Sequence, residues 1–563
     1  MASRTQTGLS EVRGEAGQPL EDLTVDRVLR RAVDTWGDQE AFVFTEQQVR
    51  WTWAAFAKQV DQMASSLLGL GLRPGDRIGI WSPNRPEWVL TQFASARIGL
   101  VLVTINPAYR ENEAAHALRT SECAALVMAT RHKSSEYAVM LQSLAPELTS
   151  CVPGALNAER LPDLRVVIEM TDRPTLGCLA FDSLLREVGP EAIAELDRIE
   201  ANLDPDEPIN IQFTSGTTGA PKGATLSHRN IVNNSRFIVS GQRLVSEDVL
   251  CVPVPLYHCF GMVAGTLGCA GVGATVVFPG AAFDPDQVVT ALEQERCTAV
   301  YGVPTMFLAM LASQQGQQRD LSRMRTGVMA GAPCPAGLMR RCAAELNLTE
   351  LTICYGMTET SPISFQTSID DPIETRYETV GQVHPHVEVK IIDHDGKTVP
   401  VGQDGELCVR GYSVMLGYWN DEERTREAVD TDGWIHTGDL ASLDAGGYGR
   451  IIGRVKDMII RGGENIYPRE VENTLLQHPD VLDAQVFGVH DDTFGEQVCA
   501  WVRTEPGREV DEDALRKFCR ERMAHFKVPK FLRIVEVFPM TVTGKAQKFR
   551  MRQAMEVELG VAR

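Results

Sequence analysis

The sequence predicts an α/β fold: a large N-terminal domain of parallel βα layers with a small β subdomain, followed by a small, mobile α+β C-terminal domain. Three observations predict it. A strand, a helix and a strand follow one another between residues 77 and 105, the same alternation returns between residues 298 and 354, and glycine-rich β segments replace it after about residue 380. Alternating strands and helices are typical of parallel sheets.

The length of the chain requires more than one hydrophobic core. Its 563 residues are 44% hydrophobic and 23% charged, which is typical of a globular protein of two or more domains. We expect a loose N-terminal arm over residues 1–20 and a large domain over residues 21–455, with the β subdomain at about 380–455. The C-terminal domain should span residues 456–563, with a hinge at Lys456.

The first alternation begins after a helix. Apolar side chains recur at helical spacing between residues 52 and 70, and a Pro-Gly-Asp turn follows. Residues 77–81 then read as a strand, residues 87–97 as a helix, and residues 99–105 as a second apolar strand.

The second alternation places three loops at one edge of a sheet. Strands are expected at residues 298–301, 326–330 and 351–354, with helices near residues 304–313 and 335–346. Because ligands of such sheets collect beyond the carboxyl ends of the strands, the loops after these strands should lie together. They are Gly302-Val303-Pro304, Gly331-Ala332-Pro333 and Tyr355-Gly356-Met357-Thr358-Glu359.

Charge and composition exclude several classes of function. A net charge of −20 makes the chain a poor general binder of nucleic acid. The thirteen cysteines form no C-x-x-C pair and are expected to be reduced, as in a cytoplasmic protein. The uncharged stretch 249–283 contains six glycines and three prolines, so we expect a buried strand, turn, helix and strand and no transmembrane segment. A homodimer is compatible with the sequence.

A Ser/Thr/Gly-rich loop follows a strand expected at residues 209–213 and precedes a helix that starts near Ser227. Its glycines let backbone N–H groups approach an anion, and its hydroxyls and Lys222 add donors and charge, so polyphosphate is the expected ligand. It is not a Walker A loop, because no Gly-Lys-Ser/Thr ends it. The expected ATP-binding residues of this loop are Thr214, Ser215, Gly216, Thr217, Thr218, Gly219, Ala220, Pro221 and Lys222.

This loop resembles the phosphate loop of the adenylate-forming superfamily, which includes acyl-CoA synthetases, firefly luciferase and peptide-synthetase adenylation domains. Further motifs of that superfamily match in order, and segments such as Pro255-Leu256-Tyr257-His258 resemble medium-chain fatty-acyl-CoA ligases most. The ordered motifs are Tyr355-Gly356-Met357-Thr358-Glu359, Thr437-Gly438-Asp439, Gly453-Arg454-Val455-Lys456-Asp457, Arg461-Gly462-Gly463-Glu464-Asn465-Ile466 and Thr543-Gly544-Lys545.

The resemblance implies an ATP site with Mg²⁺. Glu359 would hold Mg²⁺ near the phosphates, and Thr358 would donate to the α-phosphate. Asp439 would accept both ribose hydroxyls, with help from Arg454. The adenine pocket would be formed by Tyr355, Gly356, Gly331, Ala332 and Pro333.

The resemblance also assigns the two half-reactions. Lys545 would stabilise the charge that develops when a carboxylate attacks the α-phosphate. Lys456 would be the hinge about which the small domain rotates, and Gly462 and Gly463 would line a channel for the pantetheine of coenzyme A. The acyl pocket would be formed by His258, which borders the acid as a catalytic residue, with Phe260, Val303 and Gly331.

The expected activity is therefore a fatty acid–CoA ligase that uses ATP with Mg²⁺ and takes coenzyme A as co-substrate, with medium-chain acids expected first. Three alternatives stay open at this point. The acid could be an aryl or short thioether acid, the acceptor could be a carrier-protein thiol, or the scaffold could be a non-enzymatic acyl or nucleotide sensor.

Overall fold

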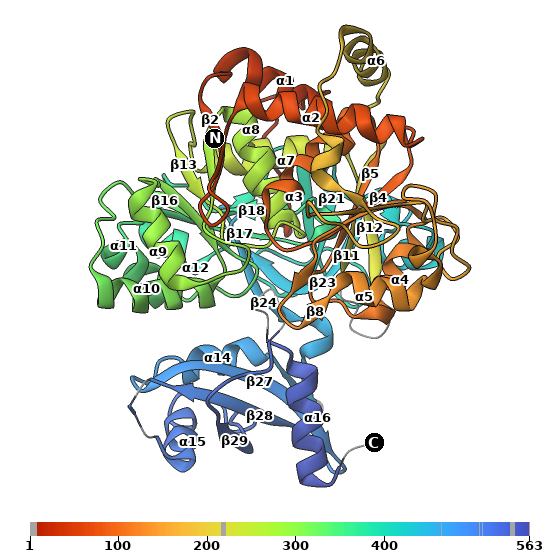
Figure 1. Cartoon of the computed structure of the whole chain (residues 1–563). Helices are drawn as coiled ribbons and strands as arrows, with labels where there is room; N and C mark the ends of the chain where they lie inside the picture. Colours follow the sequence, from red (N-terminus) through yellow and green to blue (C-terminus); the bar gives the residue numbers. More distant parts are fainter. Residues whose placement is uncertain are drawn as a thin grey trace. The chain divides into compact units, whose positions relative to one another are not determined.

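The computed structural model describes residues 8–214, 221–462, 464–505, 507–508, 510–540 and 546–561. The chain divides into two compact units, each of which is described by itself. The larger unit comprises Arg13–Glu388 and Val409–Ile435; the smaller unit comprises the segment that ends at Val12, Val389–Cys408, and the chain from His436 onward. The α/β class predicted from the sequence is confirmed (Figure 1). The domain boundary at Lys456 stays a prediction.

One sheet of the larger unit has eight strands, parallel from its first edge to β11 and antiparallel beyond it. The expected strand–helix–strand unit lies at its centre. The order is β10 (Leu179–Ala180), β9 (Val166–Glu169), β6 (Cys123–Met128), β4 (Arg77–Trp81), β5 (Val101–Ile105), β11 (Pro208–Thr214), β12 (Lys222–Ser227) and β22 (Gly417–Tyr418).

The second sheet has nine strands, and the strands expected near residues 298, 326 and 351 are neighbours in it. They run parallel, as predicted. The order is β19 (Gln382–Val383), β18 (Ile363–Gln366), β17 (Glu350–Gly356), β16 (Thr326–Ala330), β15 (Ala299–Gly302), β13 (Val249–Cys251), β14 (Thr275–Phe278), β2 (Glu40–Phe44) and β3 (Val49–Thr52).

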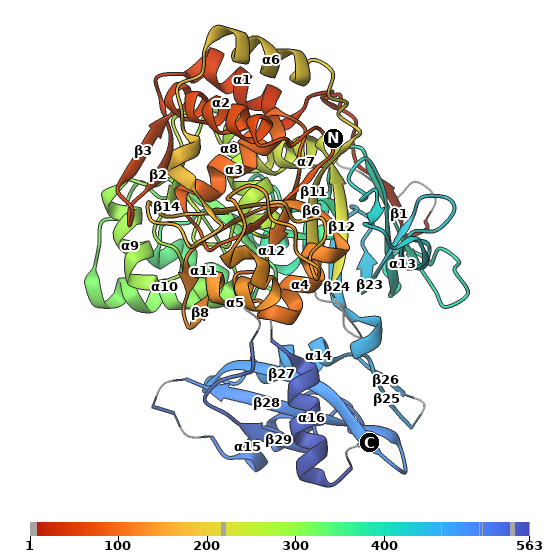
Figure 2. The ribbon, with the colours of Figure 1, turned by 45° about the vertical axis from the view of Figure 1, so that its right-hand side comes forward.

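Helices connect these strands, and the expected helices near residues 87–97, 304–313 and 335–346 are present. Figures 1 and 2 show α1, α2 and α3 side by side, and these helices contact one another. The α-helices of the larger unit are α1 (Val25–Trp36), α2 (Trp53–Gly69), α3 (Pro86–Arg97), α4 (Glu111–Thr120), α5 (Tyr137–Leu144), α6 (Pro190–Glu200), α7 (His228–Gly241), α8 (Gly268–Val272), α9 (Pro285–Gln294), α10 (Pro304–Gln317), α11 (Ala336–Glu345), α12 (Ile373–Glu378) and α13 (Glu422–Ala428).

The uncharged stretch 249–283 forms β13, a π-helix η3 (Phe260–Leu267), α8 and β14, so the expected strand, helix and strand are confirmed. The π-helix was not foreseen from the residue pattern. Within the described residues, no helix combines the length and the apolar character needed to cross a bilayer.

Helix α7 begins as the sequence predicts and fixes several distant segments. Ser227 caps it by accepting a hydrogen bond from the Asn230 backbone N–H. The buried Asn234 amide donates to the Ile363 carbonyl at 2.8 Å and accepts from the Ile363 N–H at 3.0 Å. The Nδ1 atom of His228 accepts from the Val25 N–H at 3.0 Å, and burial lowers the pKa of His228 to about 3. α7 therefore joins α1 to β18.

A charged network lies between α1, α2, α3 and α6. The guanidinium of Arg97 is 3% exposed and contacts carboxylates of Asp26 at 3.1 Å, Asp61 at 3.0 Å and Asp197 at 2.5 Å. Arg30 pairs with Asp61 at 2.7 Å. Burial raises the pKa of the Asp26 carboxyl, and the two arginines act against that rise.

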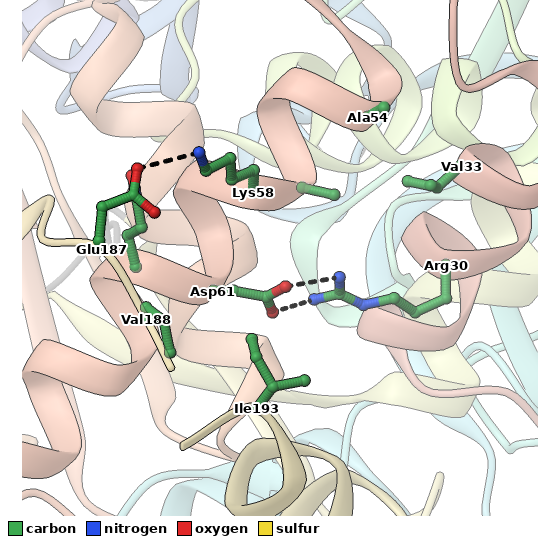
Figure 3. A pocket seen from close by; sticks show the side chains of 10 residues that line it. Arg30, Val33, Ala54, Lys58, Asp61, Glu187, Val188 and Ile193 are labelled. Atoms are coloured by element: carbon green, nitrogen blue, oxygen red, sulfur yellow. Dashed lines mark hydrogen bonds and ion pairs between the residues drawn. The ribbon is translucent and has the colours of Figure 1, made fainter. Parts of the chain in front are cut away.

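A pocket of about 260 Å³ opens beside this network. Figure 3 shows the Arg30–Asp61 pair at the pocket and the second ion pair of its lining, between Lys58 and Glu187 at 3.0 Å. Each of these charged groups has an opposite charge beside it, which is consistent with a structural role for the lining.

A five-stranded sheet lies mostly in the smaller unit. Its order is β1 (Glu11–Arg13), β20 (Val387–Ile392), β21 (Gly405–Gly411), β23 (Ile435–Leu443) and β24 (Gly449–Arg454). It corresponds to the β subdomain that the glycine-rich texture predicts.

The C-terminal part of the smaller unit is an α+β layer, as expected. Apolar residues of β27 and β28 pack under α14 and α15 on one side and under α16 on the other (Figure 1). Its elements are η5 (Val455–Asp457), β25 (Ile459–Arg461), β26 (Glu464–Ile466), α14 (Pro468–Leu475), β27 (Val481–Asp491), β28 (Gly495–Thr504), α15 (Glu512–Arg520), β29 (Phe531–Ile534) and α16 (Lys548–Leu559).

Part of the expected N-terminal arm is ordered, which corrects the prediction of a loose segment over residues 1–20. Residues 11–13 form β1, and the Ser10 N–H donates to the Val399 carbonyl at 2.7 Å. Val12 is 3% exposed. One buried apolar side chain in a polar segment is too weak a pattern to predict a strand, because its partner strand lies nearly 380 residues away.

Candidate active site

The predicted phosphate loop joins two antiparallel strands. Thr214 ends β11 and Lys222 begins β12, and the two residues are directly opposite each other in the pairing. The six residues between Thr214 and Pro221, from Ser215 through Gly216, Thr217, Thr218 and Gly219 to Ala220, lie outside the described residues. The described structure therefore fixes both ends of the loop as a β-hairpin, and its ligand contacts stay a prediction.

Glu359 is the centre of a polar cluster beside this hairpin. It lies in a 3-10 turn, η4 (Thr358–Thr360), after β17, and only 6% of it is exposed. The Tyr418 hydroxyl donates to Glu359 Oε1 at 2.9 Å, and the Thr214 hydroxyl reaches the same atom at 3.5 Å. The Met415 N–H donates to the Glu359 backbone carbonyl at 2.9 Å. The nearly buried carboxylate is thus held by hydroxyls from two strands, β22 and β11, and the Glu359 backbone by a third segment.

Tyr418 connects Glu359 to Lys222. The Lys222 ammonium lies 4.7 Å from the centre of the Tyr418 ring, within cation–π range. Burial raises the pKa of Tyr418, and the neighbouring Glu359 carboxylate raises it further, so the phenol stays a hydrogen-bond donor. Tyr418 therefore contacts both the ammonium of Lys222 and the carboxylate of Glu359.

The cluster suits a hard divalent cation. Mg²⁺ prefers oxygen ligands and commonly uses one or two carboxylates together with substrate phosphates. Glu359 offers such a carboxylate: Oε1 takes the two hydroxyls, and no hydrogen bond from a described residue reaches Oε2. The residues therefore fit the Mg²⁺ that the sequence predicts at Glu359.

The loops after β15 and β16 meet, as the parallel order predicts. Gly331 has φ +84°, and a Cβ added to it would lie 3.2 Å from Val303 Cγ1. A side chain at position 331 would therefore be strained and would press on Val303. Ala332 and Pro333 continue the Gly331 loop before α11.

The third loop is shorter than predicted. Tyr355 and Gly356 belong to β17, where they pair with Phe365 and Ile363 of β18, so the loop begins at Met357. A Cβ on Gly356 would lie 1.9 Å from the Pro362 carbonyl oxygen, so only glycine permits this pairing. The Tyr355 ring lies 6.1 Å from the Phe365 ring.

Aromatic side chains surround the residues that are predicted to form the acyl pocket. Phe260, at the start of the π-helix, stacks on Tyr301 with ring centres 5.3 Å apart, and Tyr301 is two residues before Val303. The Tyr301 hydroxyl accepts from the Gln242 amide at 2.9 Å. Phe260 is partly exposed above the fully buried Tyr301. The His258 ring lies 4.2 Å from that of Tyr257.

The predicted ribose pair is in the smaller unit. Asp439 of β23 and Arg454 of β24 are directly opposite each other, and Arg454 Nε donates to Asp439 Oδ1 at 3.2 Å. Asp439 is largely buried, while Arg454 is 48% exposed. Gly438, with φ +68°, turns the chain just before Asp439. Lys456 lies in the short η5 turn after Arg454.

Gly462 turns the chain between β25 and β26 with φ +60°, and its N–H donates to the Phe494 carbonyl at 2.8 Å. Arg461 stacks over the Phe494 ring at 4.5 Å. Gly463 and Lys545 lie outside the described residues. Their predicted roles in the thiol channel and in the first half-reaction stay predictions.

Sequence reasoning missed Tyr418 and Gln242. Tyr418 is 59 residues from Glu359 and reaches it only because β22 pairs with β12. Gln242 follows the last turn of α7, where a polar residue is normally exposed, yet it is fully buried. Tyr418 lies in residues 411–419, another segment that resembles medium-chain fatty-acyl-CoA ligases, and a search for partners of Glu359 there was the available signal.

Comparison with known proteins supports one family along nearly the whole chain. Residues 29–419 match the model of the AMP-binding enzyme family, and residues 470–545 match that of the AMP-binding enzyme C-terminal domain. The mitochondrial medium-chain acyl-CoA ligase ACSF2 of Danio rerio is 46% identical over 98% of this chain and 91% of its own. The putative acyl-CoA synthetase YngI of Bacillus subtilis is 43% identical over 94% of this chain and 96% of its own.

Solved structures agree with this similarity. The anthranilate CoA ligase AuaEII in complex with anthranoyl-AMP superposes with a TM-score of 0.82 at 26% identity, over 96% of this chain and 99% of the other. ATP-bound MatB from Rhodopseudomonas palustris superposes with a TM-score of 0.78 at 27% identity, over 95% of this chain and 99% of the other.

Proposed function

This chain belongs to the AMP-binding enzyme family, and from that premise we propose that it is an ATP-dependent fatty acid–CoA ligase of the AMP-forming type. The reaction has two steps. A carboxylate and ATP give acyl-AMP and pyrophosphate, and the thiol of coenzyme A then displaces AMP to give acyl-CoA. The observation that carries the proposal is the nearly buried Glu359, held by Tyr418 and Thr214 beside Lys222 at the end of a phosphate-loop hairpin.

In the first step the protein brings two anions together. Lys222 and the loop from Thr214 to Pro221 bind the triphosphate, Thr358 donates to the α-phosphate, and Lys545 bridges the attacking carboxylate and the α-phosphate oxygens. Preorganised positive charge at that point stabilises the transition state more than the ground state. Glu359 would hold Mg²⁺, which supplies charge neutralisation at the phosphates.

The nucleotide base and sugar are recognised by neutral and acidic groups. Tyr355 and Gly356 of β17 and the loop Gly331-Ala332-Pro333 form the adenine pocket. Asp439 accepts the ribose hydroxyls, and its contact with Arg454 at 3.2 Å supports this role because it fixes the carboxylate on β23.

In the second step a different surface faces the adenylate. Rotation about Lys456 removes Lys545 and presents Gly462 and Gly463, whose lack of side chains leaves room for pantetheine. The positive φ of Gly462 supports this proposal, because a glycine turn places no side chain in the space proposed for pantetheine.

The acid is an apolar one, with medium-chain fatty acids as the first choice. Phe260, Val303 and Gly331 offer aromatic and aliphatic surface, the partly buried His258 borders it, and residues 249–283 carry no charge that could pair with a second ionic group on the substrate. The Danio rerio relative is named as a medium-chain ligase, which favours the same chain-length class here.

The test is to incubate the purified chain with ATP, Mg²⁺, coenzyme A and a panel of acids. The panel contains butanoate, octanoate, palmitate, benzoate and 3-methylthiopropanoate. The corresponding acyl-CoA and AMP should form fastest with octanoate. Faster turnover of benzoate or 3-methylthiopropanoate would show that the substrate is an aryl or thioether acid and not a medium-chain fatty acid. Formation of a thioester and release of AMP with an acyl carrier protein, but not with coenzyme A, would show that the acceptor is a carrier protein. A protein that binds ATP without ever releasing AMP would be a sensor.

We also propose a cytoplasmic location and a homodimeric assembly. The thirteen cysteines are all free, which is typical of a reducing compartment. Cell fractionation tests the location, and light scattering of the purified chain tests the assembly.

A further inference from the structure

Three side chains that the proposed reaction does not use converge on one point in the five-stranded sheet. Glu406 and Cys408 are two residues apart in β21, so their side chains face the same side of the sheet. His436 lies on the neighbouring strand β23. His436 Nδ1 is 3.1 Å from Glu406 Oε2 and 3.7 Å from Cys408 Sγ. The three atoms all lie within 4.8 Å of one another.

Two groups compete for the same nitrogen atom of the imidazole. Nδ1 has one position, which either carries a hydrogen and donates to the Glu406 carboxylate or carries a lone pair and accepts from the Cys408 thiol. Both partners nevertheless approach this one atom. A cation at the common point resolves the competition, because it accepts an electron pair from the carboxylate, the imidazole and the thiolate together.

The separations fit a tetrahedral metal centre. Zinc bonds of about 2.05 Å to nitrogen, about 2.1 Å to oxygen and about 2.3 Å to sulfur, at roughly 109°, place nitrogen and oxygen about 3.4 Å apart and nitrogen and sulfur about 3.5 Å apart. The observed separations are 3.1 Å and 3.7 Å. Shifts of a few tenths of an ångström are therefore enough to bring the two distances from His436 Nδ1 to these values.

The donor set and its exposure decide which cation enters. A thiolate and an imidazole favour zinc and cobalt over Mg²⁺, which prefers oxygen. Cys408 is fully buried, while the side chains of His436 and Glu406 are 35% and 27% exposed, so the ion has a route from solvent on their side. We propose that Glu406, Cys408 and His436 bind one zinc-class divalent cation, with the fourth position taken by water.

The site is coupled to the turn that presents Asp439. The second carboxylate oxygen of Glu406, Oε1, accepts from the Gly438 N–H at 3.2 Å. The Thr437 hydroxyl donates to the Leu407 carbonyl at 2.7 Å and accepts from the Asp439 N–H at 3.1 Å. A cation on Oε2 of Glu406 fixes the same carboxylate that holds this turn. The site is distinct from the magnesium position proposed at Glu359.

The experiment titrates the reduced full-length chain with Co²⁺ in the presence of excess Mg²⁺. One equivalent of Co²⁺ should give a thiolate-to-cobalt charge-transfer absorption and the intense visible bands of a four-coordinate centre, and Zn²⁺ should displace it. Cys408→Ser should abolish the charge-transfer absorption. His436→Gln and Glu406→Gln should weaken Co²⁺ binding at least about tenfold, the scale for losing a supporting group at a metal site.

The matched control is Cys151→Ser, because Cys151 is a partly exposed thiol far from β21 in sequence and should leave the absorption unchanged. Circular dichroism checks that each variant is folded, and His436→Gln gives a solvent-facing variant if Cys408→Ser fails that check. Zn²⁺ should raise the unfolding temperature of the wild type and of Cys151→Ser, but not that of His436→Gln. Absence of the absorption, or its survival in both Cys408→Ser and His436→Gln, would overturn the proposal.

Discussion

Replacing Tyr418 with phenylalanine removes one hydroxyl from the Glu359 cluster and leaves the aromatic ring in place. The ring keeps its contact with the Lys222 ammonium, 4.7 Å away, so the variant isolates the hydrogen bond of 2.9 Å to Glu359. Glu359 is 6% exposed, so water cannot freely replace the lost donor. We expect the carboxylate to be misplaced for the metal–triphosphate complex.

The size of the effect follows from the charge of the acceptor. A hydrogen bond to a charged group contributes about 1.5–3 kcal/mol, and each 1.36 kcal/mol corresponds to about a factor of ten in rate. Tyr418→Phe should therefore lower kcat/KM for ATP in the pyrophosphate-releasing step by about 10- to 100-fold. Thioester formation from supplied octanoyl-AMP and coenzyme A should change less than about twofold, because no triphosphate is bound in that step.

Tyr412→Phe is the matched control. Its hydroxyl accepts from the Asn234 amide at 3.4 Å and is not assigned to the ATP site, so the loss should stay below about threefold. The reasoning is refuted if Tyr418→Phe slows both half-reactions equally, or if Tyr412→Phe costs as much as Tyr418→Phe.

Four further outcomes are expected. Lys545→Ala should slow adenylation by about 10²–10³-fold and spare thioester formation from acyl-AMP, since it removes one preorganised charge; equal loss in both steps would contradict the role. Gly463→Leu should do the reverse, and a collapse of pyrophosphate exchange in that variant would exclude the channel. Asp439→Ala should raise KM for ATP at least about tenfold. Arg454→Ala, which removes a 48%-exposed partner, should change KM by less than about fivefold. A larger effect for Arg454→Ala than for Asp439→Ala would contradict the role of Asp439 as the main ribose-binding residue. His228 stays neutral in the folded protein, with its pKa at about 3, whereas the unfolded chain takes up a proton near pH 6.5. The free energy of unfolding should therefore fall as pH drops from about 6.5 toward about 3, by about 2 kcal/mol at pH 5 for this group; denaturant titrations of His228→Gln should show a shallower fall, and an unchanged slope would refute the assignment.

The parts of the fold that could be predicted from the sequence are those encoded over short distances. The strand at 326–330 and the helix start near Ser227 agree with β16 and α7 to within a residue. Their signals are local: a short apolar run, and a hydroxyl residue placed just before a helix. The meeting of Val303 and Gly331 could be predicted as well, because parallel order alone brings the ends of β15 and β16 together.

The parts that could not be predicted depend on pairings between distant strands. The sequence predicts Glu359 as a Mg²⁺ ligand but not its hydrogen-bond donor Tyr418. Tyr418 reaches Glu359 through the pairing of β12 with β22, and a strand of two residues is too short to predict. The sequence predicts a loose arm where β1 lies, because the partner strand β20 is nearly 380 residues further along the chain. The π-helix at Phe260 was read only as a helix, since an apolar run with glycines does not distinguish the two hydrogen-bonding patterns.

The charge network around Arg97 has a consequence for how the N-terminal region assembles. Its three carboxylates come from α1, α2 and α6; Asp26 is fully buried, whereas Asp197 is 64% exposed, so the pair with Asp26 depends most on the guanidinium. Leaving one member of a buried ion pair without its partner costs about 3–5 kcal/mol, a large share of the stability of a typical domain. Loss of α1 should therefore leave the Arg97 guanidinium on α3 without its most buried partner, Asp26, and α1 and α3 are expected to unfold together.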